Sequence, residues 1–168
     1  VIYTWAGPEI AVASTKAYTT QMVILYLLAI DMAYKFDKLT REEYEHNIKS
    51  LYKLKKGIKN MLGYAEKIKS VADRIKDKTR MFYLGRGLDF VIAVEGALKS
   101  KEISYIHSEA FASGELKHGT IALIEEGIPV VINVTQSDLF EKSVSNIKEV
   151  TARGAYVIAI AKEGNKLV

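Results

Sequence analysis

The 168-residue sequence predicts an α/β fold in which a parallel sheet carries helices on both faces, joined to a helical connector. Two observations predict this class. In the second half of the chain, short runs that are apolar throughout alternate with helical patterns, which is typical of a sheet wound by right-handed crossovers and covered on both faces. In the first half, apolar residues recur every three or four positions over long stretches, which is the spacing of helices.

The composition is that of an ordinary globular protein, with 49% hydrophobic and 26% charged residues. The absence of Cys excludes disulfides, thiolate metal sites and a cysteine nucleophile. The longest apolar run, Met22–Ile30, is far shorter than the ~20 residues that a membrane-spanning helix needs. The first residues, Val1–Tyr3, do not resemble a signal sequence. We therefore expect a cytoplasmic protein that does not enter membranes.

Positive charge is concentrated between Lys35 and Arg80, where there are 14 basic and 7 acidic side chains, although the net charge of the whole chain is only +4. The basic residues are mostly lysines spread around a helical pattern, and aromatic residues that could stack on bases are not interleaved with them. We interpret this segment as solvated helix faces and not as a nucleic-acid site.

The start of the chain is predicted to be mainly one long helix. Val1–Tyr3 is interpreted as the tail of a strand, and Ser14 or Thr15 can cap a helix that runs to about Tyr34. A chain that begins on a strand tail, with no partner strands before it, is expected to be a piece of something larger. Residues 1–36 are therefore assigned to the C-terminal end of a first domain.

Residues 37–79 are predicted to form the helical connector. Thr40 and Glu43 have the spacing of a capping box, in which each residue satisfies a backbone N–H of the other at the start of a helix. Apolar residues continue at helical spacing beyond Gly63. This pattern predicts two antiparallel or kinked helices.

Residues 80–168 are predicted to hold the N-terminal part of a second domain, which contains the sheet. The expected order is strand 81–84, helix 88–106, strand 128–134, helix 139–153 and strand 155–160. Ligands of such sheets bind beyond the carboxyl ends of the strands, which directs attention to the loop Gly85–Gly87. This loop either binds a phosphate or carboxylate at the start of the next helix or is a tight turn with an exposed Arg86.

Three ionisable residues share one side of the helix predicted at 88–106. Glu95, Lys99 and Glu102 project within a sector of about 60°, and the positions that flank this sector are apolar. The pattern predicts charges held in an apolar surrounding, where desolvation raises the pKa of Glu and lowers that of Lys. The alternative is a solvated Glu–Lys ladder of the kind found on many surface helices.

Histidine adds a further candidate. His118 lies in a loop flanked by glycines and can titrate near neutrality, so it can serve as an acid or a base, whereas the plainer interpretation is a polar loop residue. His107 is a weaker candidate. The spacings of a metal site and of a nucleophile elbow are not found. We therefore expect no metal and no organic cofactor.

Three stretches of the sequence carry a resemblance to a known family. They are Ala6–Ala17 (AGPEIAVASTKA), Val94–Ala110 (VEGALKSKEISYIHSEA) and Gly114–Gly119 (GELKHG). In this order they resemble the isomerase half of the glutamine:fructose-6-phosphate aminotransferases, the glucosamine-6-phosphate synthases. The resemblance implies a flavodoxin-like sheet of the sugar isomerase (SIS) type in two tandem copies, of which this chain holds the end of the first and the beginning of the second.

The resemblance also implies roles for individual residues. The family's proton carrier between C1 and C2 of the open-chain sugar matches Glu102, and Lys99 lies beside it. The histidine that opens the sugar ring, reaching into the neighbouring subunit's site of a homodimer, matches His118. The segment that contacts the sugar matches Val12 and Ser14. We also assign Glu95 to substrate binding because it lies on the same helix face.

The implied substrate is fructose 6-phosphate and the implied product is glucosamine 6-phosphate. The glutaminase domain, the phosphate-binding loops of the first copy and a C-terminal lysine of the family lie outside this chain, so we expect an excised piece that is inactive alone. Thr120 replaces the proline that usually follows the Lys-His-Gly motif, which is expected to loosen the turn. Two alternatives stay open: a non-catalytic module that senses sugar phosphates, and a related amino-sugar isomerase or deaminase.

Overall fold

The computed structural model describes residues 1–165 and divides the chain into two compact units, one from Val1 to Ala72 and one from Asp73 onward. None of the helices in this described part combines the length and the apolar character that crossing a membrane requires.

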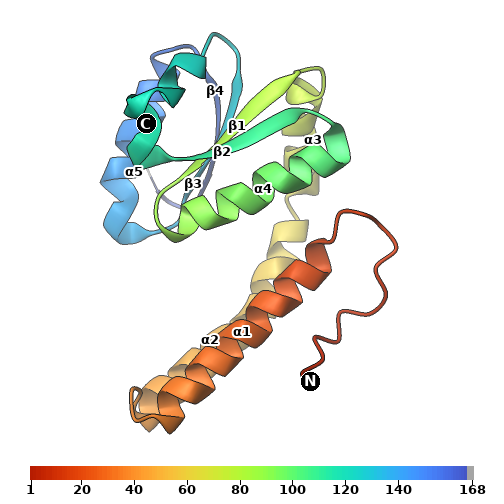
Figure 1. Ribbon diagram of the computed structural model, residues 1–168, viewed down its shortest axis with the longest axis vertical. Helices are drawn as coiled ribbons and strands as arrows, with labels where there is room; N and C mark the ends of the chain where they lie inside the picture. Colours follow the sequence, from red (N-terminus) through yellow and green to blue (C-terminus); the bar gives the residue numbers. More distant parts are fainter. Residues whose placement is uncertain (166–168) are drawn as a thin grey trace. The chain divides into compact units, whose positions relative to one another are not determined.

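The first unit is built on an antiparallel pair of helices, α1 (Thr15–Lys35) and α2 (Arg41–Leu62), seen in Figure 1. The rings of Tyr34 and Tyr44 pack beside the turn between them, with centroids 4.7 Å apart. The predicted capping box is confirmed: the Thr40 hydroxyl accepts from the Glu43 backbone N–H (3.2 Å), and the Glu43 carboxylate accepts from the Thr40 N–H (2.8 Å). Helix α2 therefore begins where the sequence predicts.

The predicted strand at Val1–Tyr3 is wrong, because the residues before α1 form neither strand nor helix. A strand needs a hydrogen-bonded neighbour, and none of the described segments pairs with these residues. Ser14 is the N-cap of α1 as predicted, but its hydroxyl donates to the Glu9 carboxylate (3.0 Å) instead of accepting from the helix. The helical pattern of the connector breaks at Gly63, after which α3 (Ala65–Ile75) begins.

The second unit contains a four-stranded parallel sheet in the order β2-β1-β3-β4, as Figure 1 shows. Its strands are β1 (Arg80–Gly85), β2 (His107–Ala112), β3 (Pro129–Val134) and β4 (Tyr156–Ala161). Three of the four were predicted. The edge strand β2 was missed because it carries polar residues such as His107 and Glu109, which an edge position tolerates.

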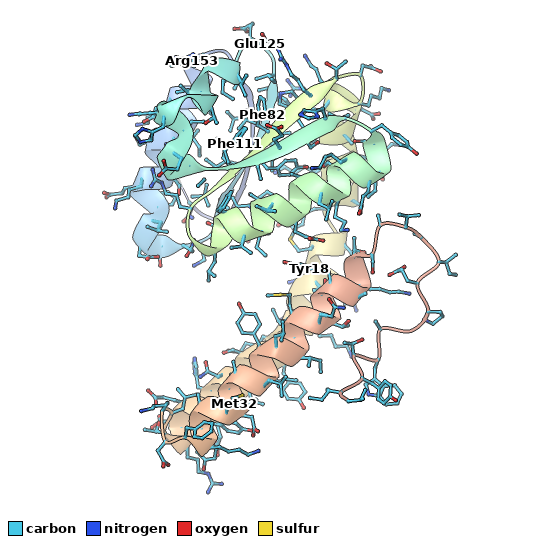
Figure 2. All side chains as sticks on the ribbon, viewed as in Figure 1. Tyr18, Met32, Phe82, Phe111, Glu125 and Arg153 are labelled. Atoms are coloured by element: carbon cyan, nitrogen blue, oxygen red, sulfur yellow. The ribbon has the colours of Figure 1, made fainter. Side chains whose placement is uncertain are left out.

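Alternate residues of the strands face opposite layers, which makes the unit a three-layer α/β/α structure. Phe82 and Leu84 face one layer, where Ile147 and Val150 of α5 (Phe140–Thr151) complete the larger core. Figure 2 shows Phe82 close to Phe111 of β2 in this core, and their ring centroids are 5.5 Å apart. A fully buried aliphatic or aromatic side chain contributes about 1.5–3 kcal/mol by leaving water.

The other face of the sheet is covered by α4 (Leu88–Ser104), which Figure 1 shows on the side opposite α5. Met81 and Val131 form a smaller core there, and Tyr83 packs against α4 at Gly96. The Tyr83 hydroxyl is hydrogen bonded to Ser100 of the same helix. The predicted α/β class with helices on both faces of a parallel sheet is thus confirmed.

Candidate functional site

Helix α4 packs on the sheet through its small residues. Asp89, Ala93 and Ala97 are its buried positions, and a Cβ added at Gly96 would lie only 3.0 Å from the Tyr83 ring. The apolar residues that flank the charged sector are exposed instead: Val91, Ile92, Val94, Leu98 and Ile103. The apolar surrounding that the sequence predicts for the charges is therefore itself largely exposed, because the small side chains allow the closest approach of helix to sheet.

Apart from Asp89, three charged residues of α4 lie on the side of the helix opposite its buried positions. We call Glu95, Lys99 and Glu102 the α4 cluster. Lys99 Nζ is 2.7 Å from Glu102 Oε2 and 3.5 Å from Glu95 Oε1, so one ammonium group bridges two carboxylates. The three side chains are only 20–27% exposed, so they are partly sheltered in spite of their outward position. The structure thus brings together three of the residues predicted to act.

The protonation of Lys99 is set by its neighbours. The hydrogen bond to Glu102 raises the pKa of Lys99 above its ordinary value. Burial acts in the opposite direction, but the hydrogen bond together with the charges of Glu102 and Glu95 outweighs it. The expectation that desolvation lowers this pKa is wrong for the arrangement seen in this chain. At neutral pH the cluster therefore holds an ammonium group that can donate hydrogen bonds.

His118 is not part of the α4 cluster. It ends η1 (Ser113–His118), a short helix whose Leu116 is buried in the core on the α5 side of the sheet. Its side chain is 75% exposed, and Nε2 lies 3.9 Å from the Glu115 carboxylate. The histidine and the cluster are thus carried by opposite layers of the unit.

The predicted substrate-binding residues Val12 and Ser14 belong to the first unit. Val12 is almost fully exposed, and Ser14 is tied to Glu9 through its hydroxyl. Both residues lie in the segment without helix or strand that leads into α1.

The loop at the carboxyl end of β1 is closed by internal bonds. The Asp89 carboxylate accepts from both the backbone N–H (2.8 Å) and the hydroxyl (2.5 Å) of Thr135, which follows β3. The Gln136 side chain donates to the backbone carbonyl of Arg86 (2.6 Å), and Arg86 Nε donates to Asn146 of α5 (3.0 Å). Arg86 is half-buried. The loop is therefore neither an open anion site at the start of α4 nor a turn with a freely exposed arginine.

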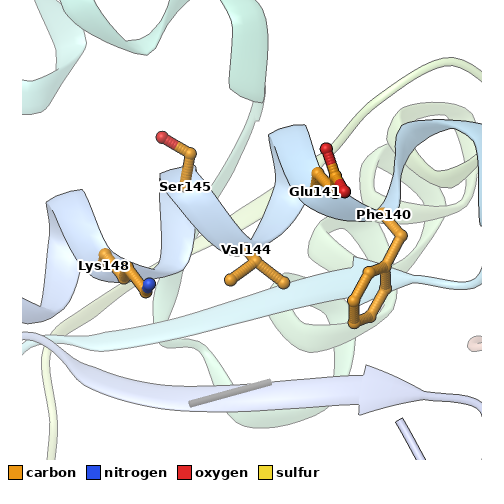
Figure 3. A pocket seen from close by; sticks show the side chains of 5 residues that line it. All are labelled: Phe140, Glu141, Val144, Ser145 and Lys148. Atoms are coloured by element: carbon orange, nitrogen blue, oxygen red, sulfur yellow. The ribbon is translucent and has the colours of Figure 1, made fainter. Parts of the chain in front are cut away.

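Two cavities formed by described residues of the second unit are relevant here, and neither is lined by the α4 cluster or by His118. The first, shown in Figure 3, is a depression of about 340 Å³ along α5 whose lining residues all come from Phe140–Lys148. The second, about 270 Å³, is lined by residues of three segments and is called the basic cavity: Arg86, Ser113, Lys117, Lys142, Asn146 and Glu149. No group of three His, Asp or Glu side chains within residues 1–165 is arranged to hold a metal ion.

Sequence reasoning did not find the basic cavity, although one signal was present. Lys142, Asn146 and Glu149 recur at i, i+4 and i+7 and so share one stripe of α5. Glu149 lies near three donors there. Burial acts to raise the pKa of its carboxyl group, but hydrogen bonds from Lys117 (2.9 Å), Asn146 (3.2 Å) and Ser145 (3.3 Å) outweigh this and hold the pKa below its ordinary value.

A parallel sheet of this order with helices on both faces defines an open α/β domain of the kind that handles small ligands. Residues 74–168 match the family described as SIS domain, which is more than half of the sequence. The chain therefore belongs to the SIS domain family.

Within this family, the chain is similar to glutamine–fructose-6-phosphate aminotransferases. The glutamine–fructose-6-phosphate aminotransferase (isomerizing) of Caldanaerobacter subterraneus is 56% identical over 98% of this chain, and that of Clostridium acetobutylicum is 57% identical over 99%. This chain spans 27% of the length of each. The solved C-terminal domain of glucosamine-fructose-6-phosphate aminotransferase from Francisella tularensis superposes with a TM-score of 0.91 at 41% identity, over 94% of this chain and 44% of that one.

Proposed function

We propose that this chain is part of the isomerase domain of a glutamine–fructose-6-phosphate aminotransferase and contributes to making glucosamine 6-phosphate from fructose 6-phosphate. The proposal is supported by the identity to relatives of that name over almost the whole chain. The observation that carries its chemistry is the α4 cluster, in which a protonated Lys99 bridges the carboxylates of Glu95 and Glu102.

In the proposed reaction, Glu102 moves a proton between C1 and C2 of the open-chain sugar. A carboxylate can take up a proton next to a carbonyl or imine and return it to the neighbouring carbon. Lys99 stays charged because its pKa is raised, so it can stabilise the oxyanion that forms when the proton leaves, or adjust the basicity of Glu102. Glu95 keeps Lys99 in place and lies on the face that the substrate would contact.

The remaining roles follow the family resemblance. His118 assists ring opening in the site of the neighbouring subunit of a homodimer, which suits an exposed histidine carried by the layer opposite the α4 cluster. Val12 and Ser14 contact the sugar. A glutaminase domain and the rest of the isomerase domain are the partners expected in the complete cytoplasmic enzyme, since this chain spans only 27% of its relatives.

The apolar surface of α4 is consistent with such a larger assembly. Val91, Leu98 and Ile103 are 41–64% exposed around a charged cluster that is less exposed than they are. Apolar surface of this kind gains stability when another part of the protein covers it. Covering it would also lower the dielectric around Glu102 and strengthen its interactions with a substrate.

A chimera tests the proposal. Residues 1–168 replace the matching segment of the Caldanaerobacter relative, and formation of glucosamine 6-phosphate is measured. We expect an active enzyme whose kcat falls about 100-fold or more with Lys99→Met, because an oxyanion loses its charged donor. The matched control Lys101→Met, on the exposed part of the same helix, should leave kcat unchanged. A folded chimera without activity, or equal effects of the two lysine variants, would contradict the proposal.

A second candidate function is a module that senses sugar phosphates without reacting with them. It would use the same fold, and binding would not depend on Glu102 as a proton carrier. In the chimera, sugar-phosphate binding without product formation would favour this candidate.

A further inference from the structure

We propose that the basic cavity binds an oxyanion of the phosphate class, at a place separate from the α4 cluster. The cavity lies where the loops after two neighbouring parallel strands meet α5. Arg86 follows β1 directly, and Ser113 follows β2, whose last residue is paired with the last residue of β1. Loops beyond the carboxyl ends of strands are the usual binding positions in parallel α/β sheets.

The cavity has more positive than negative charge. Three cationic side chains line it, Arg86, Lys117 and Lys142, against the single carboxylate of Glu149. Glu149 is already paired with Lys117 at 2.9 Å. Within residues 1–165, neither Arg86 nor Lys142 forms an ion pair, so two positive charges remain available to an anion. Arg and Lys are the residues that proteins use most to bind phosphate groups.

An independent observation comes from Ser113. Ser113 is 2% exposed and is one of the residues that line the cavity, and its Oγ is buried without a hydrogen-bond partner among the described residues. A buried hydroxyl without a partner costs free energy, so such groups usually mark the place of a ligand or an ordered water. A phosphate oxygen in the cavity would accept from this hydroxyl once the Ser113 side chain turns toward the cavity.

The Arg86 guanidinium group is held by the fold before any ligand arrives. The bond from Arg86 Nε to Asn146 fixes one side of the guanidinium group and leaves its terminal nitrogens free to donate. Gly114, next to Ser113, has no side chain, and a Cβ there would already be in van der Waals contact (3.4 Å) with Arg86 Nη1. Such preorganisation reduces the entropy that a ligand loses on binding.

The experiment is an NMR titration of the ¹⁵N-labelled 168-residue chain with inorganic phosphate, with sodium chloride at equal ionic strength as the reference. We expect saturable shifts of the Ser113, Gly114 and Lys117 amides with phosphate only. Equal shifts with chloride would overturn the proposal, because they would report charge screening alone. Shifts confined to α4, or the absence of saturable shifts at millimolar phosphate, would overturn it as well.

Matched variants identify the groups that bind. Lys142→Gln and Ser113→Ala should each weaken phosphate binding at least about fivefold, since each removes one direct interaction. Lys148→Gln is the control, because Lys148 is on the same helix but does not line the basic cavity. It lies one turn after Val144, and Figure 3 shows these two side chains on the other side of α5 from Ser145. Equal weakening by Lys148→Gln would overturn the proposal. Circular dichroism checks the fold of each variant, and Lys142→Gln keeps the test decisive if Ser113→Ala does not fold.

Discussion

Replacing Asp89 by Ala should destabilise the second unit strongly. Asp89 is 5% exposed and joins the start of α4 to the end of β3 through two hydrogen bonds from Thr135. A hydrogen bond to a charged group contributes about 1.5–3 kcal/mol. Because Thr135 is exposed, water can accept from its N–H and its hydroxyl in the variant, which offsets part of this loss. The expected loss is therefore about 2–3 kcal/mol in the free energy of unfolding.

Thermal unfolding measures this loss. In a domain of this size, 1 kcal/mol lowers Tm by about 4–8 °C, so the Asp89→Ala variant should melt roughly 8–24 °C lower. Because the chain has two units, NMR signals of β1 and β3 should be followed together with circular dichroism. Those signals report the second unit alone.

Two further variants separate the contributions of the individual hydrogen bonds of Asp89 to stability. Asp89→Asn keeps one oxygen that can accept, so it should lose about half as much as Asp89→Ala. Thr135→Val removes only the hydroxyl donor and should cost about 1 kcal/mol. The control is Asp138, an exposed residue three positions after Thr135. Its replacement by Ala should change the free energy of unfolding by less than about 0.5 kcal/mol. A loss of less than about 0.5 kcal/mol for Asp89→Ala, as small as that of the control, would refute the reasoning.

Two other predictions concern glycine and pH. Gly85→Ala should prevent folding of the second unit, because the new Cβ would collide with the backbone of Asp89 and Phe90. At Gly57 in α2, a new Cβ meets no atom within 4 Å. Gly57→Ala should therefore raise the free energy of unfolding, measured in urea, by about 1 kcal/mol. Equal effects of the two would be inconsistent with this packing. Glu149 has a pKa lowered from 4.5 in the folded state, so it contributes stability above pH 4.5 that is lost as the pH falls below that value. Glu149→Gln should flatten this acid-side loss in a pH series of unfolding curves, and an unchanged slope would contradict the assignment.

Much of the fold could be predicted because its signals are local. The capping box at Thr40 and the apolar strand 81–84 each depend on neighbouring residues, and both are confirmed. The edge strand β2 was missed because its pattern depends on a partner strand and not on its own composition. The strand at Val1–Tyr3 failed for the same reason, since a strand without a hydrogen-bonded neighbour does not form.

The candidate site was predicted only in part. The spacing of Glu95, Lys99 and Glu102 correctly placed them on one helix face within reach of each other. The face of the helix that packs on the sheet was not identified, because Ala93 and Ala97 are small and give a weak hydrophobic signal although they allow close packing. The basic cavity joins residues from three distant segments, and a single sequence carries no signal that Arg86, Ser113 and Lys142 meet.

Glu102→Gln tests the central claim most directly. In the chimeric enzyme, deuterium exchange at C1 and C2 of the sugar phosphate is followed by NMR. The variant should slow this exchange at least about 100-fold, because the amide cannot carry the proton, while sugar phosphate still binds. Glu141→Gln, an exposed residue on α5, provides the control and should exchange at the normal rate. Normal exchange in the Glu102→Gln variant would show that another group moves the proton.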